Sequence, residues 1–171
     1  GNQPNITHWN LARLAETLLP LINPDDIDDA TRLVTAALDG FIPAYTSAWG
    51  QLIRDKIGLS KQQPEDDQLI ADLFLALDGQ NVDYTQFFRA LANDPAETVP
   101  PLFDDPSAIA DWLAAWTARG ALEDGSFADR AVAMNRINPI YIPRNHLVEE
   151  ALAAAEAGDY GPFEALLAVL K

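Results

Sequence analysis

Helix-start signals followed by apolar residues at helical spacing recur along this chain and restrict it to an all-α fold. After Pro64, for example, three acidic residues precede apolar side chains at every third or fourth position. No segment alternates apolar and polar residues as a half-buried strand does. We therefore predict a compact all-α domain of about eight helices, some kinked at proline or glycine, with no internal repeat.

Capping residues and prolines set the ends of the predicted helices. The residues expected to cap or open a helix are Thr7, Asn23 with Pro24, Pro64, Asp83, Asp105 with Pro106, Ser126 and Pro143. The predicted helices cover, to within a residue or two, 8–22, 24–58, 64–77, 84–91, 106–116, 127–137, 143–157 and 162–171. Pro20 should kink or shorten the first of these, and Gly40 and Pro43 should kink or split the second. The longest predicted loop is 93–104, and the Trp side chains at 9, 49, 112 and 116 are expected in the core.

Length and charge narrow the classes of partner. The chain has 171 residues, 26 acidic and 11 Lys or Arg, for a net charge of -15. One domain over residues 1–171 is expected, and its field repels phosphate backbones and anionic lipids. We therefore predict no nucleic-acid partner and no membrane partner. No apolar run approaches the ~20 residues that span a bilayer, and the lack of cysteine excludes disulfides and suits a reducing compartment.

None of the common catalytic or ligand-binding motifs is found in this sequence. The stretch from Leu77 to Leu91 superficially resembles half of a calcium loop, but placing Gly79 at the loop glycine puts Phe74 and Thr85 at ligand positions. Neither a phosphate-binding loop nor a nucleophile elbow is present. Only two histidines occur, far apart in sequence. The residues alone therefore predict neither a metal site nor a catalytic dyad.

Residues 130–148, called the basic segment below, are the exception to the acidic composition, because they contain no Asp or Glu. Arg144 is predicted to lie in the first turn of a helix, where the helix dipole disfavours a cation by roughly 0.3–1 kcal/mol. Pro139 and Pro143 favour extended backbone at the residues before them. The candidate structural or interdomain residues of the segment are Arg130, Arg136, Asn138, Tyr141, Arg144, Asn145 and His146.

Three interpretations of the basic segment stay open at this point. The segment could pack against an acidic helix of the same domain, with Arg144 paired to a carboxylate. It could instead dock against another domain or bind an anionic ligand. The first of these predicts that replacing Arg144 by Ala lowers the melting temperature.

In the basic segment and elsewhere, the chain resembles the C-terminal part of the selenoprotein O family, whose bacterial members are called YdiU. The most specific matching motifs are Met134-Asn135, Asn138-Pro139, Tyr141-Ile142, Arg144-Asn145-His146-Leu147 and Ala155-Glu156-x-Gly158-Asp159. Upstream matches include Gln3-Pro4, Trp9-Asn10-Leu11, Arg13-Leu14-Ala15, Trp49, Lys56-Ile57-Gly58-Leu59, Asp66, Leu69-Ile70, Asp72-Leu73, Asp83-Tyr84-Thr85, Phe87-Phe88-Arg89 and Leu91. These motifs follow one another in order over nearly the whole chain. One departure is Ile142-Pro143, where Leu is more usual before the arginine.

The resemblance implies a parent protein with a kinase-like fold that binds ATP in an inverted pose and transfers AMP, with Mg²⁺, to Ser, Thr or Tyr hydroxyls of protein substrates. The family's ATP-contacting, catalytic and metal-binding residues lie upstream of the part matched here. The resemblance therefore implies that the kinase-like part precedes Asn2. The resemblance thus implies no catalytic, cofactor-binding or metal-binding residue in this chain. The redox-active Cys or selenocysteine of the family is also absent here.

These inferences lead to two hypotheses of different classes. The first is a non-catalytic helical domain that packs on the upstream kinase-like domain and supports it. The second is a free-standing helical module for protein interaction. Under the first hypothesis the reading frame extends far upstream of Asn2, and the compartment is the cytoplasm for a bacterial member or mitochondria for a eukaryotic one.

Overall fold

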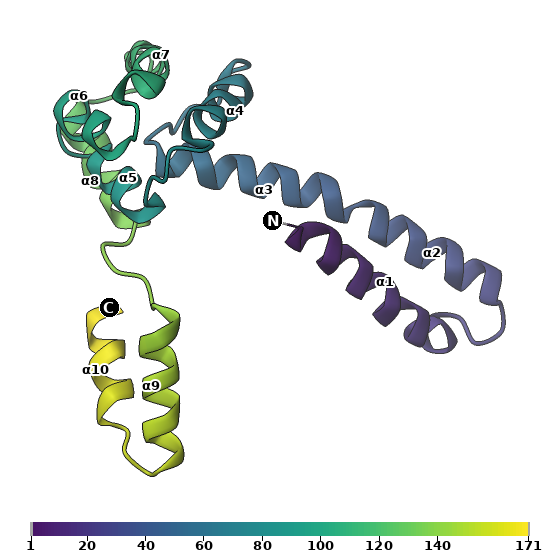
Figure 1. Ribbon diagram of the computed structural model, residues 1–171. Helices are drawn as coiled ribbons and strands as arrows, with labels where there is room; N and C mark the ends of the chain where they lie inside the picture. Colours follow the sequence, from purple (N-terminus) through teal and green to yellow (C-terminus); the bar gives the residue numbers. More distant parts are fainter. Residues whose placement is uncertain (1, 171) are drawn as a thin grey trace. The chain divides into compact units, whose positions relative to one another are not determined.

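The computed structural model describes residues 2–170, and these form ten α-helices, two short 3-10 helices and no strand (Figure 1). The all-α prediction is therefore confirmed. The helices are α1 (Gln3–Ile22), α2 (Ile27–Asp39), α3 (Phe41–Lys56), α4 (Asp66–Leu77), α5 (Tyr84–Ala90), α6 (Pro95–Thr98), η1 (Pro100–Leu102), η2 (Pro106–Ile109), α7 (Ala110–Gly120), α8 (Phe127–Ile137), α9 (Asn145–Glu156) and α10 (Gly161–Leu170).

Contacts within the chain divide it into two units, and the boundary between them in the sequence follows Ile53. In the first unit, α1 and α2 lie side by side and antiparallel (Figure 1). Ala30 is the one fully buried side chain of this hairpin within the described residues. Trp9 is 60% exposed and Trp49 is also exposed, so the prediction that these two Trp pack in a core is wrong. A single domain over 1–171 stays a prediction.

Two predicted helix starts in the first unit are wrong. Helix α1 begins at Gln3, with a proline in its first turn, so Thr7 lies inside the helix and does not cap it. Helix α2 is capped by Asp26, whose side chain accepts hydrogen bonds from two backbone N–H groups. The Asn23 side chain accepts from the backbone N–H of Asp25 and of Asp26, which places Pro24 in a turn before the helix. The predicted break near Gly40 is confirmed, since α2 ends at Asp39 and α3 begins at Phe41.

The second unit, from Arg54 onward, confirms most of the predicted caps. The side chains of Asp83, Asp105 and Ser126 each accept a backbone N–H at the start of a helix. The predicted loop over 93–104 is wrong, because α6 and η1 lie within it. A proline at the start of each supplies a backbone angle suited to helix, and the Thr98 hydroxyl donates to the Asn93 carbonyl at 2.7 Å.

Aromatic side chains from α5 and α7 form the centre of the second unit. Phe87 and Trp112 pack at 6.1 Å between ring centroids, and Trp112 stacks on Trp116 at 6.0 Å. Each indole N–H donates to a backbone carbonyl, that of Trp112 to Leu69 and that of Trp116 to Ile57, both at 2.8 Å. The core positions predicted for these two Trp residues are therefore confirmed, and each polar indole nitrogen is satisfied.

A buried ionic cluster, called the Arg119 cluster, joins α7 to the loop before α4. Arg119 Nε donates to Asp66 Oδ1 at 2.6 Å, and its Nη1 donates to Glu123 Oε1 at 2.8 Å. All three side chains are buried. Glu123 also accepts from the hydroxyl of Ser60 at 2.6 Å and from its backbone N–H at 2.8 Å. The cluster therefore fixes the chain after α3 against the end of α7.

Lowering the pH through the range in which the Glu123 carboxylate takes up a proton should destabilise the second unit. Burial raises the pKa of Glu123, but hydrogen bonds from Ser60 and Arg119 outweigh it and lower this pKa from 4.5 to about 2. A lowered folded-state pKa gives a contribution that is complete above about pH 4.5 and is lost as the pH falls to about 2, here about 3 kcal/mol. Urea unfolding from pH 7 to 2.5 measures this loss. In Glu123→Gln the dependence on pH over this window should be shallower, and an equally steep dependence would assign the loss to other carboxylates.

No helix among residues 2–170 is long and apolar enough to cross a membrane.

Candidate functional site

The basic segment contains most of α8, an extended stretch and the start of α9. Helix α8 begins with a capping box, in which Ser126 and Asp129 each accept the other's backbone N–H. It ends at Ile137, and the backbone N–H of the next residue, Asn138, donates to the Met134 carbonyl at 2.8 Å. Asn138 itself has extended backbone, as the following proline predicts.

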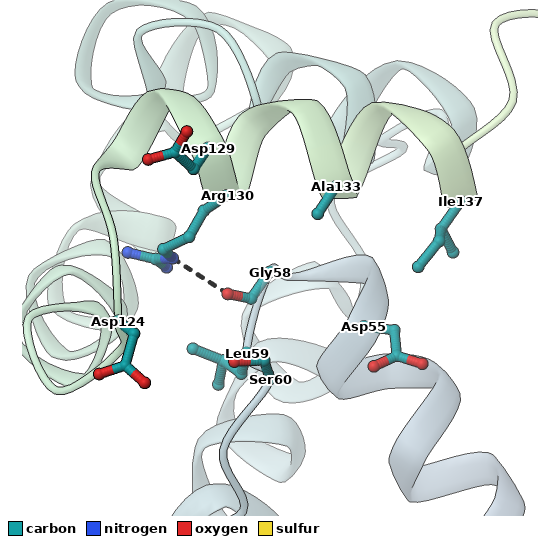
Figure 2. Close-up of a pocket in the computed structure, with 9 residues that line it drawn as sticks. All are labelled: Asp55, Gly58, Leu59, Ser60, Asp124, Asp129, Arg130, Ala133 and Ile137. Atoms are coloured by element: carbon teal, nitrogen blue, oxygen red, sulfur yellow. Dashed lines mark hydrogen bonds between the residues drawn. The ribbon is translucent and has the colours of Figure 1, made fainter.

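Arg130 is half-buried on α8 and contacts the loop after α3. Its Nε donates to the Gly58 carbonyl at 3.0 Å, as Figure 2 shows, and its guanidinium lies 5.1 Å from the centroid of the Trp116 ring. A Cβ on Gly120 would meet Arg130 Nη1 at 2.1 Å, so any larger residue there would displace the guanidinium from its present position. Burial lowers the pKa of Arg130, and its Nη2 has no hydrogen-bond partner among the described residues. Arg130 is thus mainly a packing residue.

The cavity in Figure 2, about 200 Å³ in volume, lies between α8 and the loop after α3. Its lining residues are Asp55, Gly58, Leu59, Ser60, Asp124, Asp129, Arg130, Ala133 and Ile137. Two of the carboxylates are already bound, because Asp129 accepts from Ser126 and Asp124 pairs with Lys61 at 2.7 Å. Among residues 2–170, no three His, Cys, Asp or Glu side chains are placed to hold a metal ion. Three of the charged lining residues, Asp124, Asp129 and Arg130, therefore already have polar partners within the fold.

Asn138 holds α8 to the end of α3 and to α5. It is 1% exposed, and its side chain exchanges two hydrogen bonds with Lys56, accepting from Nζ and donating to the carbonyl, both at 2.8 Å. Its backbone carbonyl accepts from Arg89 Nη1 at 3.2 Å, and Arg89 also donates to the Asn135 carbonyl at 3.2 Å. Of the predicted site residues, Asn138 is thus the most deeply integrated in the fold.

Arg144 lies at the N-cap position of α9 and pairs with Asp83, the residue that caps α5. The Nη2 to Oδ2 distance is 3.2 Å, and 53% of the Arg144 side chain is exposed. A hydrogen bond from the Gln86 backbone N–H, and after it one from Arg144, lowers the pKa of Asp83. Arg144 has the intradomain carboxylate partner that one interpretation expects, but the residues around it are exposed and not buried.

Replacing Arg144 by Ala should change the free energy of unfolding by at most about 1 kcal/mol, because an exposed ion pair contributes little. Urea unfolding at low and high salt measures the change, and screening should reduce it further at high salt. Asp83→Asn, which removes the partner charge but keeps a side chain able to cap α5, is the matched variant. A loss above about 2 kcal/mol would mean that Arg144 does more than form this pair.

The remaining predicted residues are not brought together by intramolecular contacts. Arg136, Tyr141, Asn145 and His146 are exposed, and among residues 2–170 no hydrogen bond or ion pair joins their side chains to the rest of the chain. Tyr141 is 62% exposed on the extended stretch between the two prolines. These four side chains are free to contact another molecule or another part of a longer protein.

Two cations outside the basic segment, Lys56 and Arg89, donate hydrogen bonds to residues of that segment. Both occupy the last turn of a helix, where the dipole favours a cation. That position is the signal that could have drawn attention to them. Their contact with Asn138 links residues 82 and 49 positions apart in sequence, so it could not be predicted from local spacing.

Comparison with known proteins gives one consistent result. The model of the family described as "Protein adenylyltransferase SelO" matches residues 1–171. "Protein nucleotidyltransferase YdiU" of Chromobacterium violaceum is 45% identical to this chain over 99% of its length, and the protein of that name from Rhodopseudomonas palustris is 43% identical over 99%. A third, from Mycobacterium sp. (strain KMS), is 48% identical over 98% of the chain.

These matches cover only part of each relative. The chain spans 36% of the Chromobacterium and Rhodopseudomonas proteins and 34% of the Mycobacterium protein. It therefore corresponds to about a third of the length of the curated relatives it matches.

Proposed function

The chain belongs to the family of the protein adenylyltransferase SelO, and from this membership we propose that it is the helical, non-catalytic part of a longer protein nucleotidyltransferase. The observation that carries the proposal is that the family match extends over all 171 residues while these residues equal about a third of each relative. The upstream kinase-like part is the proposed partner.

The proposed reaction of the longer protein is AMP transfer from ATP to a Ser, Thr or Tyr hydroxyl of a protein substrate. The hydroxyl oxygen releases its proton to solvent and bonds to the α-phosphorus of ATP. The bond between this phosphorus and the oxygen that bridges to the β-phosphate breaks, and pyrophosphate leaves. Mg²⁺ would neutralise charge on the phosphates during this step. Because the resemblance places the ATP-contacting and metal-binding residues upstream of this chain, we assign ATP and Mg²⁺ to the kinase-like part.

An apolar groove on the first unit supports the proposal that this chain packs on another structure. The groove is formed by α1, α2 and the start of α3, and its volume is about 570 Å³. Its lining residues are Leu11, Leu14, Ala15, Leu18, Ile22, Val34, Ala37, Leu38, Gly40 and Phe41. A two-helix hairpin that buries so little of its own apolar surface gains stability when another element covers it.

The second candidate function is a helical interaction module that acts without a catalytic part, and the same groove favours it. Under this alternative the groove binds another protein, and the reading frame does not encode a kinase-like part. The relatives named above are bacterial, and for a bacterial source we propose the cytoplasm as the compartment.

The test compares three proteins in ATP labelled on the α-phosphate, with Mg²⁺ and a mixture of candidate protein substrates. They are this chain, the full product of its reading frame, and that product without residues 1–171. We expect label on protein only with the full product, and weaker or no transfer when these residues are deleted. A matched reaction with ATP labelled on the γ-phosphate should give no transfer, which separates AMP transfer from phosphorylation.

Two results would contradict the proposal. Transfer by this chain alone would mean that it contains a catalytic site. Failure of the full product, under conditions in which a YdiU protein transfers label, would favour the interaction module.

A further inference from the structure

Within the part of the chain that the structure describes, Lys56 and Arg89 have no carboxylate partner, although the sequence has more than twice as many acids as bases. Within residues 2–170, Arg119 and Arg144 each pair with at least one carboxylate. Lys56 and Arg89 instead donate to an amide oxygen and to backbone carbonyls, and both contact Asn138. Two cations therefore meet at Asn138, and within residues 2–170 neither of them forms an ion pair.

The surroundings of Lys56 leave its charge incompletely balanced. Its Nζ donates to Asn138 Oδ1 at 2.8 Å and lies 4.5 Å from the centroid of the Phe88 ring. Burial lowers the pKa of Lys56. A neutral amide and the face of one ring attract an ammonium less strongly than a carboxylate does. An ammonium has three donors, and Asn138 takes only one of those of Lys56.

A small cavity lies beside this ammonium. Its volume is about 170 Å³, and its lining residues are Lys56, Tyr84, Thr85, Phe88, Asn138, Pro139 and Ile142. The walls are mainly aromatic and apolar, with one lysine as the positive group. Cavities for drug-sized ligands and cofactors measure roughly 300–1,000 Å³, so this one suits a single functional group on a short apolar stem and not a nucleotide.

We propose that this cavity binds one carboxylate group, with Lys56 as its ion-pair partner and Arg89 as a second source of positive potential. The net charge of -15 favours a monoanion over a dianion such as phosphate, because the field of the chain repels the dianion more strongly. The short apolar stem fits the side chain of Asp or Glu on a protein segment, or a small free acid. The proposal does not depend on the proposed function, since its test uses this chain alone.

The test is a titration of the ¹⁵N-labelled chain, followed by NMR at constant ionic strength. The probes are acetate, a capped Ala-Glu-Ala peptide and inorganic phosphate. We expect acetate and the peptide to give saturable shifts at the Asn138 side-chain amide and the Phe88 backbone amide, and phosphate to bind more weakly. Tighter binding of the peptide than of acetate assigns the site to a protein segment, and the reverse assigns it to a free acid.

Lys56→Met keeps the apolar stem and removes the charge, so binding should weaken by about tenfold or more. Lys61→Met is the matched control, because Lys61 is exposed and paired with Asp124, and binding should be unchanged. If Lys56→Met unfolds the chain, Arg89→Met should still weaken binding several-fold. The proposal is overturned by the absence of shifts, by shifts unaffected in these variants, or by tighter binding of phosphate.

Discussion

Replacing Arg119 by Met should lower the free energy of unfolding by about 3–5 kcal/mol, because it leaves two buried carboxylates without their counter-charge. The Arg119 side chain donates to Asp66 and Glu123 and also to the Lys61 carbonyl. In the folded protein a carboxylate without this partner either remains charged in a site of low dielectric constant or takes up a proton. Both outcomes cost stability at neutral pH.

Urea unfolding followed by circular dichroism at pH 7 measures this loss. Arg32→Met is the matched control, because Arg32 pairs with Asp29 on an exposed face of α2 and its removal should cost less than about 1 kcal/mol. The Arg119→Met loss should shrink as the pH is lowered, since protonation of the carboxylates removes the unbalanced charge. A loss below about 1 kcal/mol would show that water or another cation replaces Arg119.

Local signals predicted much of the helical fold, and tertiary contacts account for most of what they missed. Asp83, Asp105 and Ser126 were placed correctly because a cap needs only its own side chain and the next three residues. The prediction that Thr7 caps the first helix is wrong because a proline upstream starts α1 earlier. Trp9 and Trp112 both sit at apolar positions of a helix, and the pattern cannot tell that only Trp112 has a neighbouring element to bury it.

The basic segment could be recognised from composition, but the roles of its residues could not. The sequence predicts Arg144 in the first turn of a helix, and only one of the three interpretations gives it a carboxylate partner. In the structure Arg144 is the N-cap residue just before α9, and its partner Asp83 lies 61 residues away. Arg130 uses its guanidinium against a carbonyl and an aromatic ring, and no acid signals that contact in the sequence. Asn138, with no charge, contacts both Lys56 and Arg89. Contacts in which a cation donates to a neutral acceptor cannot be predicted from the distribution of charged residues in the sequence.

Replacing Trp116 by Ala should lower the free energy of unfolding by about 3–5 kcal/mol, in the range for a large aromatic residue removed from a core. Trp116 is 2% exposed, and it touches Trp112 by stacking and Phe127 by an edge contact. Its indole N–H donates to the Ile57 carbonyl, which would lose its partner. The face that Arg130 covers would also be lost, leaving a half-buried guanidinium over a void.

Two further variants separate the causes of this loss. Trp116→Phe keeps an aromatic ring but removes the indole N–H. Its loss in the free energy of unfolding should be smaller than that of the Ala variant, because the ring retains part of the packing. Trp9→Ala is the control for removal of an indole from the surface, and it should cost less than about 1 kcal/mol because Trp9 is 60% exposed. Urea unfolding of all three provides the comparison. Equal losses at Trp9 and Trp116 would mean that the α1–α2 hairpin buries Trp9, for example by self-association, and sedimentation of the Trp9→Ala variant would then show a change in oligomeric state.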